Sequence, residues 1–229
     1  MRDRLNKVFS PDNLLWSIVA RGVDIVGLSL AWAFLSLGIV TCGPATAALY
    51  YTAVKCIRQK EKRTFLIFWR SFVANLKKGI LATLICLPFL AILGLGYGVM
   101  RANWSSTLGA VMFVAYDVAL LVPAGIVCWL FPLLGRFDNP LKTTFRTAGI
   151  LTFRHLPSTI VVVLLCVESI VAMIQYWWPV FFAPALCAIL ASLFFERIFP
   201  KYLSEDDAKK MVETSETPTE EGAHEMRKK

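Results

Sequence analysis

The chain has 229 residues, of which 57% are hydrophobic and 17% are charged, and its formal net charge is +8. Soluble domains contain about half apolar and a quarter charged residues, so this composition excludes an ordinary soluble domain and predicts an all-α, polytopic membrane protein. The basic excess lies beside the apolar segments, in residues 1–200, which favours binding to anionic lipid headgroups over binding to nucleic acid.

The first apolar segment, residues 16–40, is long enough to cross a membrane as a helix. The N-terminal sequence before it, MRDRLNKVFSPDN, is too long and too mixed in charge for a removable signal peptide. Arg21 and Asp24 lie three residues apart in the segment, so they can pair on one helix face. We expect that pair to be structural.

The sequence Cys42-Gly43-Pro44 predicts a break after the first span. Glycine suits the position after a helix end, and proline suits the first turn of the next helix. The chain is therefore predicted to restart as an amphipathic cytoplasmic helix over residues 44–59. Three small residues near its start allow close backbone approach to a neighbouring helix: Ala45, Ala47 and Ala48.

A second cytoplasmic helix is predicted to begin at Thr64, which is a preferred N-cap residue. Large apolar side chains recur at helical spacing along it: Phe65, Phe68, Trp69, Phe72 and Leu76. An aromatic stripe with a basic flank is typical of a helix lying in the plane of the membrane interface. The alternative is that the stripe packs on the helical bundle, and the sequence leaves both interpretations open.

The second and third spans are predicted over residues 79–100 and 107–134. The second contains no charged residue, and its Gly94 and Gly98 have the spacing of a contact face between membrane helices. The third contains Pro123 and Pro132, which predict a tilt or a kink.

The connection after the third span contains another predicted cytoplasmic helix. Asn139 is expected to cap it, Pro140 to begin it, and Leu156-Pro157 to end it just after His155. Arg146 belongs to its basic face. Two cytoplasmic connections thus each present an amphipathic helix below the bilayer.

The fourth and fifth spans, residues 157–177 and 179–199, are joined only by YWWP, which predicts an antiparallel hairpin with tryptophans at the membrane interface. Residues 201–229 are polar and acidic and are predicted to be a disordered tail. The predicted organisation is a five-span membrane domain, residues 1–200, followed by this tail, with two or three cytoplasmic amphipathic helices.

The distribution of lysine and arginine predicts the orientation. The first and third connections carry most of the basic residues between spans, so the positive-inside rule places both, and the tail, in the cytoplasm. An odd number of spans then places the N-terminus outside the cytoplasmic membrane, although Arg2, Arg4 and Lys7 oppose that placement.

Two separated motifs carry a family resemblance: GIVTCGPATAALYY and FPLLGRFDNPLKTTFRTAGILTFRHLPSTIVVVLL. On these motifs, and on FWRSFVANLKKG and Asp24, the chain resembles the YesL-like family of small bacterial membrane proteins over about residues 13–200. The resemblance implies a five-helix membrane protein that is often encoded beside carbohydrate importers and polysaccharide-degrading enzymes. It implies no catalytic residues.

Three acidic residues lie at predicted membrane depth: Asp24, Asp117 and Glu168. An ionisable side chain at the bilayer centre costs about 3 kcal/mol or more unless it is paired, so each is a candidate functional residue. Asp117 and Glu168 either line a polar path for an ion or solute, or hydrogen-bond within the bundle as protonated carboxyl groups. The absence of a cation at comparable depth favours the structural role.

The leading hypothesis is an accessory protein of the cytoplasmic membrane that docks its cytoplasmic helices on subunits of a carbohydrate ABC importer, the importer link resting on the resemblance alone. The candidate docking residues are Gly43, Pro44, Phe65, Phe68, Trp69, Phe72, Asn139, Pro140, Arg146 and His155. The alternative is a small transporter or channel with Asp117 and Glu168 in its path. The scattered cysteines and the lack of catalytic motifs predict no enzyme, metal site or cofactor.

Overall fold

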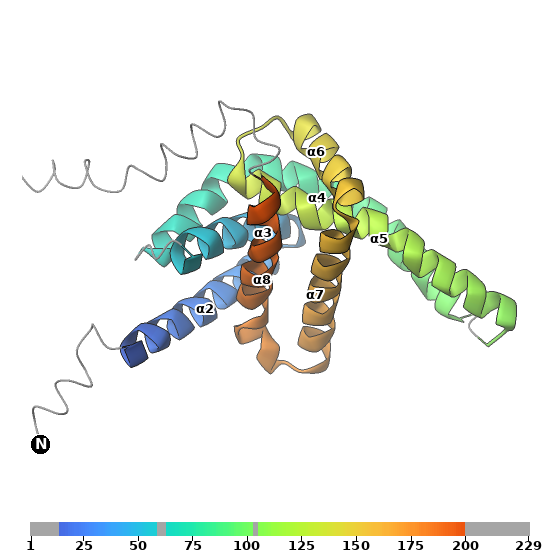
Figure 1. The fold of residues 1–229 in the computed structure, drawn as a ribbon, viewed down its shortest axis with the longest axis horizontal. Helices are drawn as coiled ribbons and strands as arrows, with labels where there is room; N and C mark the ends of the chain where they lie inside the picture. The colour runs from blue at the N-terminus through green and yellow to red at the C-terminus, as the bar shows by residue number, and fades with distance from the viewer. Residues whose placement is uncertain (1–13, 59–62, 103–104, 200–229) are drawn as a thin grey trace, which may run out of the picture. The chain divides into compact units, whose positions relative to one another are not determined.

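The computed structural model describes residues 14–58, 63–102 and 105–199. In these ranges the chain is helical with short connections and contains no strand, which confirms the all-α prediction there (Figure 1). The α-helices are α2 (Leu14–Ser36), α3 (Cys42–Thr52), α4 (Thr64–Ala102), α5 (Thr107–Arg136), α6 (Leu141–Arg154), α7 (Leu156–Gln175) and α8 (Ala183–Ile198).

Three helices in the described ranges are long and apolar enough to cross a membrane: α4 with 39 residues, α5 with 30 and α7 with 20. They bear out the membrane-protein prediction, but the count of five spans is not confirmed. Helix α8 has 16 residues, about 24 Å at about 1.5 Å per residue, which is shorter than a hydrocarbon core of about 30 Å. Helix α2 is long enough, but Arg21 and Asp24 interrupt its apolar sequence.

The predicted break after the first span is present, and it comes earlier than expected. Helix α2 ends at Ser36, and the Thr41 hydroxyl donates to the carbonyl oxygens of Leu35 and Gly38. A single 3₁₀ turn, Ile39–Thr41, then leads directly into α3. Gly43 and Pro44 therefore lie inside the first turn of α3 and do not form the connection that the sequence predicted.

Helix α3 lies at the centre of the helix packing, which corrects the prediction of an amphipathic surface helix over residues 44–59. It packs against α2, α4 and α5, and its three alanines at positions 45, 47 and 48 are fully buried. Glycines on the neighbours make this possible. A Cβ atom at Gly79 of α4 would lie 2.8 Å from Pro44 Cα, and one at Gly135 of α5 would collide with the Ala47 carbonyl oxygen. A π-helical segment, Ala53–Arg58, follows α3 directly.

The predicted cytoplasmic helix at Thr64 and the predicted span from residue 79 form one uninterrupted helix, α4. Thr64 is its first residue, but the predicted cap is not made, because the buried Thr64 hydroxyl has no hydrogen-bond partner among the described residues. The sequence changes from basic to uncharged after Lys78, but the backbone hydrogen bonding of the helix continues through Gly79. The helix therefore continues from its basic, amphipathic part into its uncharged, apolar part.

Helices α6 and α7, by contrast, are separate, as the sequence predicted. Pro140 occupies the N-cap position of α6, one residue after the expected Asn139, and His155 lies between the two helices. A buried polar contact stabilises this junction: Trp129 Nε1 of α5 donates to Thr159 Oγ1 of α7 over 3.0 Å. Thr159 Oγ1 in turn lies 3.0 Å from the His155 carbonyl oxygen, to which it donates.

Helices α7 and α8 form the predicted hairpin, with a short 3₁₀ helix, Trp178–Phe181, at its turn. Cys166 Sγ and Cys187 Sγ, one from each helix, lie 3.7 Å apart. The Ala185 amide donates to Ser29 Oγ of α2 over 3.3 Å, so the start of α8 packs on the first helix. The chain divides into two compact units between Ser192 and Leu193, and the predicted tail, residues 201–229, lies outside the described residues.

Candidate functional site

The two predicted cytoplasmic connections meet at one end of the described helices. Lys78 of α4 forms a salt bridge with Asp138 in the α5–α6 connection, and its Nζ lies 3.3 Å from the Asn139 carbonyl oxygen. Asp138 is almost fully exposed, so this is a surface ion pair. The sequence does not predict this ion pair, because nothing local links two residues 60 positions apart. The contact places both connections on the same side of the spans.

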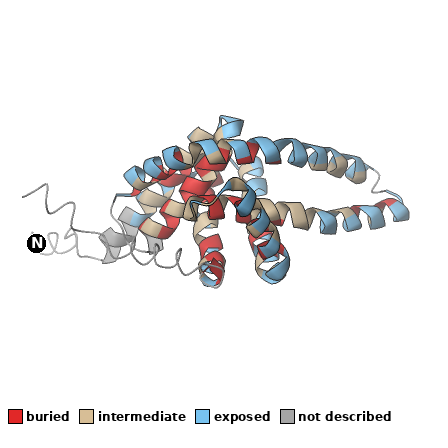
Figure 2. Cartoon of the chain, turned by 90° about the horizontal axis from the view of Figure 1, so that it is seen from above, coloured by how far each residue is buried: buried red, intermediate tan, exposed pale blue. Residues whose placement is uncertain are grey.

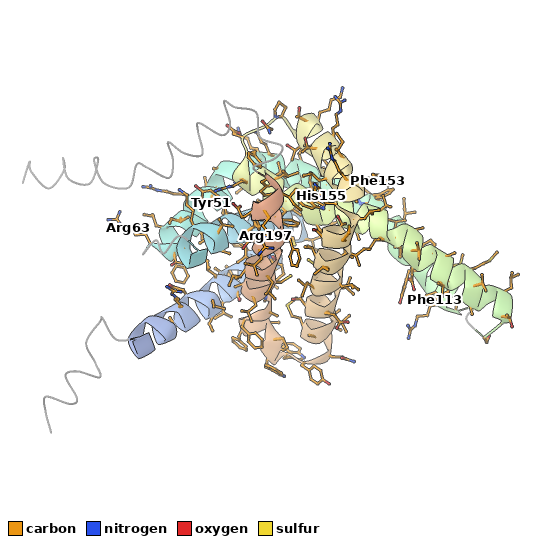
Figure 3. All side chains as sticks on the ribbon, in the orientation of Figure 1. Tyr51, Arg63, Phe113, Phe153, His155 and Arg197 are labelled. Atoms are coloured by element: carbon orange, nitrogen blue, oxygen red, sulfur yellow. The ribbon has the colours of Figure 1, made fainter. Side chains whose placement is uncertain are left out.

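Helix α6 presents one face to the outside and packs with the other. Its buried residues are Thr144, Ala148, Leu151 and Thr152. Four of its exposed residues recur every three or four positions, Lys142, Arg146, Ile150 and Phe153, and Thr143 and Arg154 are exposed beside them. Phe153 is 61% exposed and Ile150 is 47% exposed, and Figure 3 shows Phe153 on α6. The outer face of α6 therefore combines two cations with two adjoining apolar side chains.

The aromatic stripe of α4 divides between packing and exposure. Phe68 and Phe72 are buried in a cluster with Leu28, Ala45, Ala48, Leu49 and Ala185. Phe65 and Trp69 are each more than half exposed. Phe65 still touches α2, since a Cβ atom at Gly27 would lie 2.5 Å from its ring. Packing on the bundle thus holds for Phe68 and Phe72, and the interfacial position of Phe65 and Trp69 stays a prediction.

We call the exposed part of these two segments the docking face: Phe65, Trp69, Arg70 and Lys77 of α4 with Lys142, Arg146, Ile150 and Phe153 of α6. Several predicted docking residues do not belong to it. Gly43, Pro44, Phe68 and Phe72 are buried and stabilise helix packing. Asn139, Pro140 and His155 shape the ends of α6, and the His155 amide donates to the Leu151 carbonyl oxygen over 3.0 Å.

The acidic residues at membrane depth do not converge. Asp117 of α5 and Glu168 of α7 are both exposed, and Asp24 of α2 is half-buried. No ion pair joins Arg21 to Asp24 in the part of the chain that the structure describes. Within the described ranges, no group of three His, Cys, Asp or Glu side chains is arranged to hold a metal ion.

One family model matches the chain, over residues 13–97, and its description is a protein of unknown function, DUF624. The match covers α2, α3 and most of α4, and it ends before α5. No curated protein and no solved structure matches the chain. The matched region contains Cys42, Gly43 and Pro44, the first three residues of α3.

Proposed function

We propose that the chain is an accessory protein of the cytoplasmic membrane that binds cytoplasmic subunits of a carbohydrate ABC importer through its docking face. In this proposal α2 and α8 also cross the bilayer, which makes five spans, with the N-terminus outside and the docking face in the cytoplasm. The choice of an importer as the partner rests on the resemblance to the YesL-like family of the motifs around residues 38–51 and 131–165.

The outer face of α6 is the observation that carries the proposal. Phe153 and Ile150 are exposed on a helix whose opposite side is fully packed, and Lys142 and Arg146 continue the same face. Aromatic and arginine side chains are enriched at the centres of protein interfaces. The same combination also suits a helix at the membrane interface, so the choice of a protein partner rests on the family resemblance.

The placement of the two connections supports the cytoplasmic assignment. The contact from Lys78 to Asp138 and Asn139 brings the two most basic connections to the same side. The positive-inside rule then applies to them together, which strengthens an assignment made from either connection alone.

A transporter with Asp117 and Glu168 in its path is the alternative. Both side chains are exposed on the outer surfaces of their helices, so one copy of the chain does not enclose a path between them. The geometry therefore supports the docking proposal better. Uptake by purified protein in liposomes that is reduced by Glu168→Gln would favour the alternative.

Co-purification in a mild detergent tests the proposal. We expect the wild-type protein to retain permease or ATPase subunits of a carbohydrate importer, identified by mass spectrometry. The double variant Arg146→Glu/Phe153→Ala should retain at least tenfold less, because it removes a cation and an exposed aromatic side chain from α6. Ile92→Ala, an equally exposed position on the membrane-embedded part of α4, is the matched control. Recovery of the wild-type protein without importer subunits would contradict the proposal.

A further inference from the structure

Three of the six cysteines, which the sequence distributes over three helices, meet in the structure. Cys166 Sγ of α7 and Cys187 Sγ of α8 lie 3.7 Å apart and are hydrogen-bonded, although 21 positions separate them in the chain. The thiol of Cys128 on α5 also interacts with that of Cys166. Cys128 belongs to the part of α5 that packs against other helices, whereas residues 107–119 of α5 are largely exposed (Figure 2). Cys166 is therefore the central member of a row of three thiols.

The contact joins two helices whose main neighbours lie elsewhere. Helix α7 packs mainly on α5 and α6, and the start of α8 is held on α2 by the hydrogen bond between the Ala185 amide and Ser29 Oγ. Within the described residues, α7 and α8 have little other close backbone approach to each other. A covalent bond between Cys166 and Cys187 would thus add a connection that packing alone does not supply.

The two sulfur atoms are within reach of such a bond. A disulfide is about 2.05 Å long, so the sulfurs have to approach each other by roughly 1.7 Å. Each sulfur moves on an arc about its own Cα–Cβ bond, and rotation of the two side chains supplies an approach of this size. Both side chains are only partly buried, which leaves room for the rotation.

The surroundings of the two thiols select the oxidant. Exposed apolar side chains flank both cysteines: Leu164 and Val167 on α7, and Leu186 and Leu190 on α8. In a membrane such a surface contacts hydrocarbon. Hydrocarbon dissolves a neutral organic hydroperoxide and excludes a charged oxidant, because transfer of a charge out of water is costly.

We propose that Cys166 and Cys187 form a reversible disulfide when the membrane contains an organic hydroperoxide, and that this bond fixes the start of α8 to α7. Cys166 Sγ attacks the terminal peroxide oxygen, the O–O bond breaks, and the departing alkoxide takes the Cys166 proton to become an alcohol. Cys187 Sγ then attacks the sulfur of the sulfenic acid at Cys166. The S–O bond breaks, and the hydroxide leaves with the Cys187 proton as water.

The position of Cys166 between two thiols assigns it the first step. A sulfenic acid at Cys166 has a second thiol beside it on either side, at Cys187 and at Cys128. Such proximity favours the second step over reaction with a distant thiol. Overall, one hydroperoxide is reduced to an alcohol and water while two thiols are oxidised to one disulfide. The proposal does not depend on the importer association, because it concerns the purified chain alone.

Oxidation of the purified protein in liposomes tests the proposal. After treatment with cumene hydroperoxide and blocking of the remaining thiols, mass spectrometry of the digested protein should detect the Cys166–Cys187 disulfide. Its yield should be at least about tenfold higher than after treatment with oxidised glutathione, which is charged. Dithiothreitol should remove it by thiol–disulfide exchange. No disulfide with the hydroperoxide, or an equal yield with the two oxidants, would overturn the proposal.

Three serine variants test the central position of Cys166. Cys128→Ser should leave the Cys166–Cys187 disulfide unchanged, and Cys187→Ser should move the disulfide to Cys128 and Cys166. Cys166→Ser should lower the yield of any disulfide among these positions by about tenfold or more, because the interactions of both outer thiols are with Cys166. A disulfide between Cys128 and Cys187 in this variant at the wild-type yield would contradict the assignment.

The melting temperature gives a readout of what the bond does to the hairpin. A disulfide limits the freedom of the unfolded chain, so the oxidised wild-type protein should melt at a higher temperature than the reduced protein. Cys166→Ser, treated with the same hydroperoxide, should show no rise. An unchanged melting temperature in fully oxidised wild-type protein would show that the bond does not fix α8.

Discussion

Two segments of this chain share a sequence pattern but differ in whether their helix is continuous. In each, an amphipathic helix on the aqueous side leads into a membrane span: residues 64–102 and residues 141–175. The first is the single helix α4, and the second is divided into α6 and α7 at His155. Position 79 in the first segment is glycine, and α4 stays continuous even through Pro88. Pro157 lies in the first turn of α7, where a proline, which lacks an amide hydrogen, suits the start of a new helix.

The difference has a consequence for the docking face. Helix α4 is continuous from Thr64 to Ala102 and so joins the exposed aromatic side chains at its start to its apolar half. The break at His155 lets α6 turn back onto α5 and expose Phe153 and Arg146. The continuous segment therefore links its amphipathic part directly to its span, and the divided segment presents the outer face of α6.

The largest effect is expected at Gly79, where α4 depends on glycine for packing. Gly79→Ala places a Cβ atom 2.8 Å from backbone atoms of Pro44, so the two helices must separate. We expect a loss of about 3 kcal/mol in unfolding free energy, measured in detergent by circular dichroism. Gly149→Ala in α6 is the matched control, since a Cβ atom there meets nothing within 4 Å. It should stabilise the protein by up to about 1 kcal/mol through helix propensity. Equal effects at both glycines would contradict the packing role of Gly79.

The second effect concerns the junction of α6 and α7. Thr159→Val keeps the side-chain volume but removes the hydroxyl that accepts the hydrogen bond from Trp129. We expect a loss of about 2 kcal/mol, with a shift in tryptophan fluorescence, because the contact is buried. Thr143→Val, on the exposed side of α6, should change stability by less than about 0.5 kcal/mol. No difference between the two variants would mean that the hydroxyl contributes nothing to the junction.

A third experiment separates the contribution of proline from that of tertiary contacts. In Pro157→Ala we expect the break to persist, because the buried face of α6 still packs on α5, and stability to fall by less than about 1 kcal/mol. Spin labels at Thr143 and Val167 report the geometry. An increase in their separation to the roughly 36 Å of a continuous helix would show that proline alone causes the break.

The smallest effect is expected where the two segments touch at the surface. Asp138→Asn removes the charge that pairs with Lys78, but both side chains are more than a third exposed. Exposed ion pairs contribute about 0–1 kcal/mol, so the melting temperature should change little and should depend only weakly on salt. A loss of several kcal/mol in unfolding free energy would mean that this contact holds the two connections together.

The break between α6 and α7 could be read from the sequence because prolines mark the ends of both helices, and the packing of α6 on α5 then maintains it. Asn139, Pro140 and Pro157 limit the backbone at their own positions, and the structure places the ends of α6 within two residues of the prediction. The sequence did not predict that the two helices join in α4, because the predicted boundary between them rested on charge. Charge at Lys77 and Lys78 marks a change of surroundings, and backbone hydrogen bonding does not respond to it.

The candidate site was predicted only in part. The stripe from Phe65 to Phe72 was identified, but its division into buried and exposed rings depends on where α2 and α3 pack. Gly43 and Pro44 have the composition of a turn and lie instead in a packed helix, because Gly79 and Thr83 approach them from α4. Such contacts join residues that are far apart in the chain.

Composition and periodicity alone determined that this protein is helical, that its longest apolar helices match a bilayer, and where one helix must stop. These properties depend on hydrogen bonds between residues four apart and on the transfer of side chains from water. Tertiary structure alone decided that α3 is central, that Lys78 meets Asp138, and that a side chain at Gly94 or Gly98 would meet open space. A helix presents several faces of similar chemistry, and only its neighbours in space determine which of them is covered.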